Sequence, residues 1–430
     1  MAIAVRSIAE TCDAAKRASR VLARLDSSIR DSALVAIATA LEQRVDEILA
    51  ANERDVQLGA EAELGEGLLD RLRLDEARVA QVARAVRQIA ALPDPVGEVI
   101  EGRRLANGLD VRKVRVPLGV VAVVYEARPN VTIDAAALCL KSGNAIVLRG
   151  SSSAEHSNAA LAQIASEAAV AAGLPEASVS LVAGGGRSEL AELATQRDSV
   201  DLIIPRGGEG LKEALQAVAT VPVIYAASGN CHVYVDAAAD HEQAEAIVLN
   251  AKLQRPGVCN AAETLLVHAQ IAPSFIPRIV GSLTSAGVLV RADERVLELV
   301  RGQARAPWVD PALLERASEE DWASEYLALT LAVGIVDSGE QAIEHIGRYG
   351  SGHSEAIVTR DTAAARAFQL GVDAACVYVN ASTRFTDGGE FGMGAEIGNS
   401  TQKLHARGPI GLRELCTFKY LVEGDGHVRA

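Results

Sequence analysis

The sequence predicts an α/β fold with two doubly wound parallel sheets and a small additional part made of β-strands. Between residues 119 and 236, short apolar runs alternate with helical patterns, which is typical of parallel strands joined by helices. A second alternation of this kind runs from about 232 to 380. A hairpin of charged strands at 97–116 cannot enter either core, and it accounts for the additional part.

The N-terminal region, residues 5–91, has helical rather than strand periodicity. Interruptions near Asp26, Gly59 and Gly65 divide it into several helices. The spacing of three and four is clearest in Leu34, Ile37, Leu41, Val45 and Ile48.

The hairpin consists of strands at 97–104 and 109–116, joined by a turn that contains Asn107-Gly108. Asn-Gly is a strong hairpin signal, because both residues tolerate positive φ. The strands carry many charged side chains. The hairpin is therefore either a solvated flap or an arm that pairs with another subunit.

The first α/β stretch opens with Gly119–Tyr125, an apolar run that predicts a strand buried on both faces. Further strands are expected at 145–149, 179–182, 201–204 and 222–225, and helices at 131–142, 154–172, 187–195 and 208–219.

The second α/β stretch has strands near 232–236, 264–268, 287–290, 331–336, 355–359 and 375–379. The tail at 381–412 is rich in glycine and polar residues, and a last strand is expected at 418–422.

Composition excludes several classes of function. The net charge of −14 argues against nucleic acid or an anionic membrane as the main partner. The six cysteines contain no C-x-x-C pair, so we expect no metal site and no redox dithiol. There is no signal-peptide pattern and no long apolar span, which favours a cytoplasmic setting with free thiols.

The leading chemical candidate is Cys259, within Gln254–Asn260. A Pro-Gly turn precedes it and an apolar strand follows, which places the thiol on a tight loop. Lys252 and Arg255 are close in sequence, and positive charge stabilises the reactive thiolate. The alternative is a buried structural cysteine.

A second candidate is the segment Tyr125–Thr132, at the carboxyl end of the first buried strand, where open α/β sheets bind ligands. Asn130 can offer an amide donor to an oxyanion at the start of the next helix. Alternatively, Asn130 is only a helix cap.

Two further strand ends offer phosphate-binding chemistry. Arg149 is followed by Ser151 and Ser152 at a helix start, although ordinary capping explains the serines equally well. Gly207 and Gly208 also lie between a strand and a helix, where backbone can approach a dinucleotide. Because no G-x-G-x-x-G fingerprint follows a strand, glycines alone do not predict NAD binding.

Residues 342–357 contain two histidines, His345 and His353, without zinc-ligand spacing. These histidines either cap helix carbonyls or contact a substrate or phosphate, and the spacing does not decide between the two roles. With Tyr349-Gly350-Ser351 and Ser354-Glu355, this segment resembles the signature of the γ-glutamyl phosphate reductase family.

The segments 125–132, 254–260 and 390–398 are similar to that family too, and the resemblance covers essentially the whole chain. The family belongs to the aldehyde dehydrogenase superfamily. The resemblance therefore implies an aldehyde dehydrogenase-like fold, with an NADPH-binding domain (1–96 and 117–231), a catalytic domain (232–400) and an oligomerisation arm (97–116 and 401–430).

The resemblance also implies roles for single residues. Cys259 matches the superfamily nucleophile and Asn130 its oxyanion donor. Arg149 falls where a common lysine contacts the adenosine ribose, and Ser152 replaces a glutamate that binds the 2′-hydroxyl, which favours NADPH. Glu325 falls near the glutamate of the nicotinamide ribose. The expected cofactor contacts are Arg149, Ser151, Ser152, Gly207, Gly208 and Glu325, and the expected substrate contacts are Arg128, Glu126, Arg255, Asn260 and His353.

One departure from the superfamily is informative. Hydrolytic aldehyde dehydrogenases carry a general-base glutamate about thirty residues before the nucleophile, whereas residues 226–230 here contain no carboxylate. A thioester at Cys259 is then not hydrolysed, which suits NADPH-dependent reduction of L-glutamate 5-phosphate to the 5-semialdehyde in proline biosynthesis.

Two alternatives stay open, a coenzyme A-acylating aldehyde dehydrogenase and a non-catalytic scaffold of the same fold. The resemblance further suggests a homo-oligomer and an association with glutamate 5-kinase.

Overall fold

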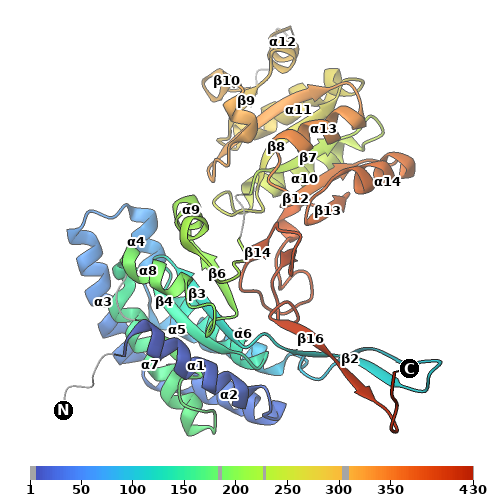
Figure 1. Cartoon of the computed structure of the whole chain (residues 1–430). Coiled ribbons are helices and arrows are strands. Elements are labelled where there is room, and N and C mark those ends of the chain that lie inside the picture. Colours follow the sequence, from blue (N-terminus) through green and yellow to red (C-terminus); the bar gives the residue numbers. More distant parts are fainter. Residues whose placement is uncertain (1–5, 183–185, 226–228, 303–308, 430) are drawn as a thin grey trace. The chain divides into compact units, whose positions relative to one another are not determined.

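Two units make up the chain, and each is built around a parallel sheet (Figure 1). The computed structural model describes residues 6–182, 186–225, 229–302 and 309–429. Unit 1 consists of Met1–Tyr225, Gly392–Gly398 and Ile410–Ala430, and unit 2 consists of Ala226–Phe391 and Asn399–Pro409. The predicted α/β class with two parallel sheets and a separate β part is confirmed.

Unit 1 begins with five helices: α1 (Ile8–Leu22), α2 (Ser27–Gln43), α3 (Val45–Glu61), α4 (Glu66–Leu72) and α5 (Glu76–Ala91). The predicted helical character is confirmed, but Gly59 lies inside α3, and the break at 73–75 was not predicted. A capping box starts α1, in which the Ser7 side chain accepts from the Glu10 N–H and the Glu10 carboxylate accepts from the Ser7 N–H. The break between α2 and α3 at Arg44 was not predicted, since no glycine or proline marks it.

The sheet of unit 1 contains β3 (Val120–Tyr125), β4 (Ala145–Gly150), β5 (Val179–Leu181) and β6 (Leu202–Arg206), in the order β5-β4-β3-β6. The connecting elements are α6 (Asn130–Lys141), η1 (Ser152–Ala154), α7 (Glu155–Ala171), α8 (Arg187–Ala194) and α9 (Glu209–Val218). Because β4 and β6 lie on opposite sides of β3, the strand order reverses there, which is where such sheets bind ligands.

The strand predicted at 222–225 is wrong as a full strand. Within the described residues this segment forms a single bridge, between Ile203 and Val223. Pro222 has no N–H to donate, and this limits the ladder.

The β part is an antiparallel sheet of β1 (Val99–Arg104), β2 (Asp110–Pro117) and β16 (Cys416–Glu423), in the order β1-β2-β16. The predicted hairpin is confirmed. The register of β2 with β16 runs from Pro117 opposite Cys416 to Asp110 opposite Glu423, so segments far apart in sequence lie side by side (Figure 1).

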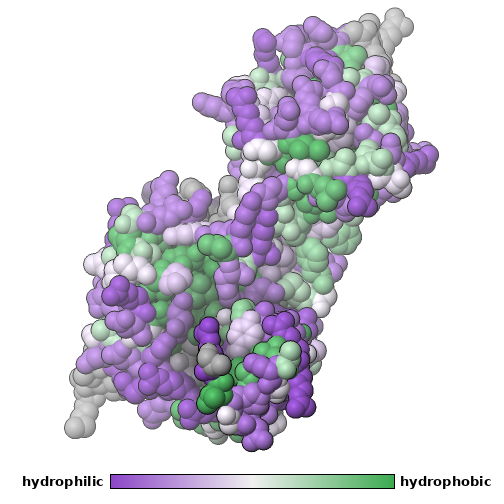
Figure 2. Space-filling model, turned by 45° about the vertical axis from the view of Figure 1, so that its right-hand side comes forward, coloured by the Kyte–Doolittle hydropathy of each residue, from purple (hydrophilic) through white to green (hydrophobic). Residues whose placement is uncertain are grey.

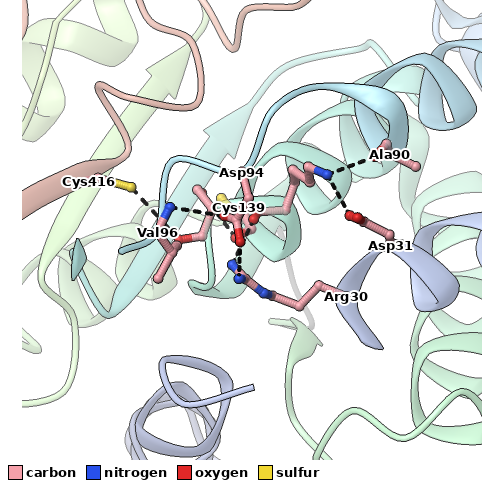
Figure 3. Close-up of polar contacts among 9 residues, drawn as sticks. Arg30, Asp31, Ala90, Asp94, Val96, Cys139 and Cys416 are labelled. Atoms are coloured by element: carbon pink, nitrogen blue, oxygen red, sulfur yellow. Dashed lines mark hydrogen bonds and ion pairs between the residues drawn. The ribbon is translucent and has the colours of Figure 1, made fainter. Parts of the chain in front are cut away.

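A buried polar cluster joins α2, α5 and α6 of unit 1, and Cys416 at the start of β16 lies near it (Figure 3). Arg30 donates to the Lys141 carbonyl at 2.9 Å and pairs with Asp94 at 2.6 Å. Lys141 pairs with Asp31 at 2.5 Å and donates to the Ala90 carbonyl. Arg30 and Lys141 are each 2% exposed, so removing one partner would leave a buried charge uncompensated.

Unit 2 has a sheet of seven parallel strands in the order β10-β9-β11-β8-β7-β12-β13. The strands are β7 (Cys231–Val235), β8 (Ala262–His268), β9 (Leu289–Ala292), β10 (Leu314–Arg316), β11 (Thr330–Val336), β12 (Ser354–Val358) and β13 (Cys376–Val379). The helices are α10 (His241–Leu253), α11 (Ala272–Ser285), α12 (Glu294–Gly302), α13 (Gly339–Tyr349) and α14 (Thr362–Gly371). Short elements complete the unit: η2 (Pro311–Leu313), η3 (Glu320–Ala323), η4 (Thr383–Phe385), β14 (Asn399–Ser400) and β15 (Gly408–Pro409).

The core of unit 2 is aliphatic, as the 3% aromatic content required. Charged and polar side chains cover much of the face shown in Figure 2, with smaller hydrophobic areas among them. Within the described ranges, no helix combines the length and apolar character needed to cross a bilayer.

Candidate active site

The thiol of Cys259 lies on the loop between α10 and β8, at the amino end of the unit 2 sheet. All six cysteines are free, and Cys259 alone is exposed. The loop closes on itself through a hydrogen bond from the Ala261 N–H to the Val258 carbonyl at 3.0 Å. Of the two interpretations of Cys259, the accessible nucleophile therefore fits the structure and the buried structural cysteine does not.

The backbone of Cys259 rests on the residues that begin β7. A Cβ added to Gly229 would lie 2.6 Å from the Cα of Cys259 and closer still to its carbonyl carbon and oxygen. Only glycine fits there, because real Cβ atoms do not approach to under 3.0 Å. The Cys231 thiol donates to the Cys259 carbonyl at 3.2 Å. Burial raises the pKa of Cys231 well above its usual range, so it serves as a neutral donor.

Glu325 joins this arrangement from the segment before β11. Its carboxylate accepts from the Gly229 N–H at 2.7 Å. Glu325 is therefore linked to the backbone of Cys259 through Gly229. The family resemblance implied that Glu325 contacts a cofactor ribose, and its hydrogen bond with Gly229 was not predicted.

Asn260 fixes the other side of the loop. Its Nδ2 donates to the Thr386 carbonyl at 2.9 Å and to the Arg384 carbonyl at 3.4 Å. The Thr383 hydroxyl donates to the Asn260 carbonyl at 2.7 Å. Asn260 is 5% exposed, so its side chain supports the loop in this structure.

A buried ion pair lies directly behind the loop. The Lys252 ammonium is 2.5 Å from the Glu263 carboxylate and donates to the Ala262 carbonyl at 2.9 Å, with both side chains fully buried. Burial lowers the pKa of Lys252 and raises the pKa of Glu263 to about 7. The suggestion that Lys252 stabilises the thiolate is therefore wrong, because its charge is committed to Glu263.

The histidine-bearing segment packs into the core of unit 2. His353 is 1% exposed, and its Nδ1 lies 2.8 Å from the Ser354 hydroxyl and 3.8 Å from the Cys231 sulfur. Burial lowers the pKa of His353 to about 4. His345 lies in a ring cluster with His232, Trp322 and Tyr349.

His232 and Glu355 form a second buried pair beside this ring cluster. The His232 N–H donates to the Glu355 carboxylate at 2.7 Å, and the His232 Nδ1 lies 3.0 Å from the same oxygen. Burial raises the pKa of Glu355. In the described part of the chain no group of three His, Cys, Asp or Glu side chains could hold a metal ion.

The candidate residues of unit 1 gather at the carboxyl ends of its strands. Glu126, after β3, accepts from the Gly208 N–H at 3.2 Å, and a Cβ added to Gly207 would lie 2.7 Å from the carboxyl carbon of Glu126. Asn130 is the first residue of α6 and donates to the Asp134 carboxylate at 2.9 Å, while Pro129 is the N-cap. The capping role considered for Asn130 is therefore wrong. Burial raises the pKa of Asp134 to about 6.

Arg149 and the serines after it lie at the end of β4. The Arg149 guanidinium donates to the Gly186 carbonyl at 2.6 Å, and burial lowers its pKa. Ser151 and Ser153 share a hydrogen bond of 2.7 Å, and Ser152 begins η1.

The structure thus assembles two groups of predicted residues. Unit 1 holds Glu126, Arg128, Asn130, Arg149, Ser151, Ser152, Gly207 and Gly208, and unit 2 holds Arg255, Cys259, Asn260, Glu325 and His353. The segment Ala226–Ser228, read as an empty general-base position, lies outside the described residues. Sequence reasoning missed Cys231, Glu263 and Arg384, which are distant from the loop in sequence or carry no motif.

Comparisons with known proteins show which family the chain is similar to. Residues 2–296 match the aldehyde dehydrogenase family. A γ-glutamyl phosphate reductase of Moorella thermoacetica is 54% identical over 415 residues, which is 96% of this chain and 97% of the relative. One of Thermobifida fusca is 53% identical and covers 99% of both chains. The crystal structure of γ-glutamyl phosphate reductase from Thermotoga maritima superposes with a TM-score of 0.95 at 45% identity, covering 99% of this chain and 100% of that one.

Proposed function

Because this chain belongs to the aldehyde dehydrogenase family, in the group of the γ-glutamyl phosphate reductases, we propose that it reduces L-glutamate 5-phosphate with NADPH through a Cys259 thioester. The family makes it an oxidoreductase with a nicotinamide cofactor. The products are L-glutamate 5-semialdehyde and phosphate, in a step of proline biosynthesis. The exposed thiol of Cys259, on a loop held by Gly229, Cys231 and Asn260, is the observation that carries the mechanism.

The chemical step begins at the sulfur of Cys259. The thiolate attacks the acyl carbon, a C–S bond forms, and the C–O bond to phosphate breaks with its electron pair left on the phosphate oxygen. The Cys259 backbone N–H stabilises the oxyanion, and Asn130 is assigned as the second donor from the family resemblance. Phosphate needs no acid from the protein to leave.

The thioester then has to survive until reduction. Residues 226–230 contain no carboxylate to activate water. Two carboxylates around the nucleophile loop already have partners: Glu325 accepts from the Gly229 N–H, and Glu263 pairs with Lys252. When bound, the cofactor supplies the hydride that reduces the thioester carbon, and collapse of the resulting adduct returns the thiolate and releases the aldehyde.

The carboxyl ends of the unit 1 strands fit a dinucleotide. Gly208 precedes α9 and a Cβ there would meet nothing within 4 Å, so a phosphate can approach the backbone N–H groups of the helix start. Arg149, Ser151 and Ser152 follow β4, and we assign them with Gly207 and Gly208 to the cofactor. Glu325 is assigned to the nicotinamide ribose.

The choice of NADPH rests on Arg149 and on the absence of a carboxylate at Ser152. Arg149→Glu is expected to weaken NADPH binding more than NADH binding, measured by fluorescence titration. Glu189 lies within electrostatic range of Arg149, so Glu189→Gln is the matched control and should not weaken NADPH. Equal loss of both cofactors in Arg149→Glu would remove Arg149 from the 2′-phosphate site.

The residues proposed to act on the substrate fall into an exposed group and a buried group. Glu126, Arg128 and Arg255 are exposed, and we propose that they contact the substrate directly. Asn260 and His353 are buried, and we propose that they act on the substrate through the shape of the nucleophile loop.

The β1-β2-β16 sheet is proposed as the site of homo-oligomer formation. Its two outer strands expose large hydrophobic side chains, Val99 and Ile100 on β1 and Phe418, Tyr420 and Val422 on β16. Exposed hydrophobic groups of this kind mark protein–protein contacts. A cytoplasmic setting and an association with glutamate 5-kinase belong to the same proposal.

The deciding experiment is NADP reduction by glutamate semialdehyde with and without inorganic phosphate. The proposal expects phosphate-dependent turnover in the wild type, none in Cys259→Ala, and unchanged NADPH binding in that variant. Turnover that depends on coenzyme A instead of phosphate would identify a coenzyme A-acylating enzyme. Full turnover in Cys259→Ala would overturn the covalent mechanism, and an unreactive Cys259 thiol would favour a scaffold.

A further inference from the structure

Besides Arg255, a second arginine is held beside the nucleophile loop, although it is distant from the loop in sequence. Arg384 belongs to η4, and its Nε donates to the Gln254 side chain at 2.9 Å. Its backbone carbonyl accepts from Asn260. Gln254 and Asn260 bound the loop that carries Cys259, so Arg384 is attached at both ends of that loop.

Arg384 interacts electrostatically with charged groups of the loop. Its pKa is lowered, first by burial and then by the positive charge of Arg255, while Asp387 and Cys259 act in the opposite direction. Arg255, Arg384 and Cys259 therefore lie within electrostatic range of one another. Two cations held close together destabilise each other unless an anion joins them.

Neither arginine forms an ion pair with any residue in the described ranges. The hydrogen bond of the Arg384 side chain in these ranges uses Nε, which leaves the two terminal amino groups for a ligand. The remaining nearby cation, Lys252, is buried against Glu263. The positive charge beside the thiol that no ion pair of the described residues neutralises thus comes from Arg255 and Arg384.

The substrate offers two anions, its phosphate and its α-carboxylate. The phosphate is bonded through one oxygen to the acyl carbon that the sulfur attacks, whereas the α-carboxylate is at the other end of the carbon chain. Cations next to the sulfur are therefore placed for the phosphate. A guanidinium binds phosphate through two parallel hydrogen bonds, which a lysine cannot reproduce.

We propose that Arg384, together with Arg255, forms the subsite that holds the phosphate of the acyl phosphate as it leaves and inorganic phosphate as it enters in the reverse direction. This inference rests on the proposed function. As the C–S bond forms, the breaking C–O bond leaves its electron pair on a phosphate oxygen, where two guanidinium groups offset the added negative charge. The phosphate then takes a proton from water.

The test uses the reverse reaction of the full chain, with glutamate semialdehyde, NADP and inorganic phosphate. In Arg384→Gln the KM for phosphate should rise at least about tenfold, which corresponds to one charge-assisted hydrogen bond. The KM for semialdehyde should change less than twofold. Arg384→Lys keeps the charge without the planar fork, and its KM for phosphate should rise by less. Arg366→Gln, an exposed arginine on α14 of the same unit, is the matched control and should leave both KM values unchanged.

A second readout follows binding rather than turnover. Inorganic phosphate should slow the alkylation of Cys259 by iodoacetamide in the wild type, and this protection should be lost in Arg384→Gln. A raised KM for semialdehyde with an unchanged KM for phosphate would overturn the inference and assign Arg384 to the α-carboxylate. Unchanged values for both would overturn it as well. Should Arg384→Gln fail to fold, Arg384→Lys decides on the same two KM values.

Failure of the proposed function would look different, because the wild type itself would then show no phosphate-dependent NADP reduction.

Discussion

Replacing Gly229 with alanine should abolish most of the activity while the substituted side chain never touches substrate. The new Cβ would lie 2.6 Å from the Cα of Cys259, and contact needs at least 3.0 Å. The Cα must move by about 0.4 Å, and the carbonyl oxygen, which is nearer, by about 1 Å or more. A misplacement of about 1 Å in a reacting group costs roughly 100-fold in rate, or about 2.7 kcal/mol.

The assay is kcat for phosphate-dependent NADP reduction, with NADPH affinity measured in parallel. We expect kcat to fall about 100-fold and NADPH affinity to change much less, because every residue assigned to the cofactor except Glu325 belongs to unit 1. Gly347→Ala is the matched control, since a Cβ at Gly347 on α13 meets nothing within 4 Å. A Gly229→Ala variant with kcat within threefold of wild type would refute the idea that this contact positions Cys259.

Three further predictions concern burial and assembly. Lys252→Met leaves the Glu263 carboxylate buried and unpaired, so the free energy of unfolding in urea should fall by about 3–5 kcal/mol; a loss under about 1 kcal/mol contradicts this. Burial lowers the pKa of His353 to about 4, so between about pH 6.5 and 4 His353 is protonated in the unfolded chain but not in the folded one. The free energy of unfolding should therefore fall as the pH decreases through this range. Urea midpoints of His353→Asn should show a shallower fall, and an equally steep one counts against the assignment. The double variant Phe418→Ser and Tyr420→Ser should sediment as a smaller assembly, whereas an unchanged mass would exclude β16 from the interface.

Patterns within a short window predicted most of the fold. The Asn107-Gly108 turn predicted the hairpin, and the apolar run that ends at Tyr125 predicted the central strand of the unit 1 sheet. The resemblance assigned both segments to one arm, but the pairing of β2 with β16 was not predicted, because nothing in either strand specifies a partner about 300 residues away. The break at Arg44 has no glycine or proline signal, and its position depends on how α2 and α3 pack.

In the candidate site, too, the residues marked by local sequence were predicted and those placed by distant packing were not. Cys259 was predicted because its turn and following strand are local. Lys252 was misjudged, since proximity in sequence does not show that an ammonium turns inward to Glu263. Arg384 was not predicted at all, because 125 residues separate it from Cys259 and only the packing of η4 against the loop brings it close.

The three-stranded β part has a consequence for synthesis on the ribosome. Unit 2 is inserted in the chain between β2 and β16, so β2 emerges about 300 residues before the strand that completes its sheet. At roughly 5–20 residues per second, the wait is on the order of 15–60 s. An apolar strand with an open edge would recruit other nascent chains during that time. The charges of Arg112, Lys113 and Arg115 on β2 therefore keep an unfinished sheet soluble until its last strand arrives.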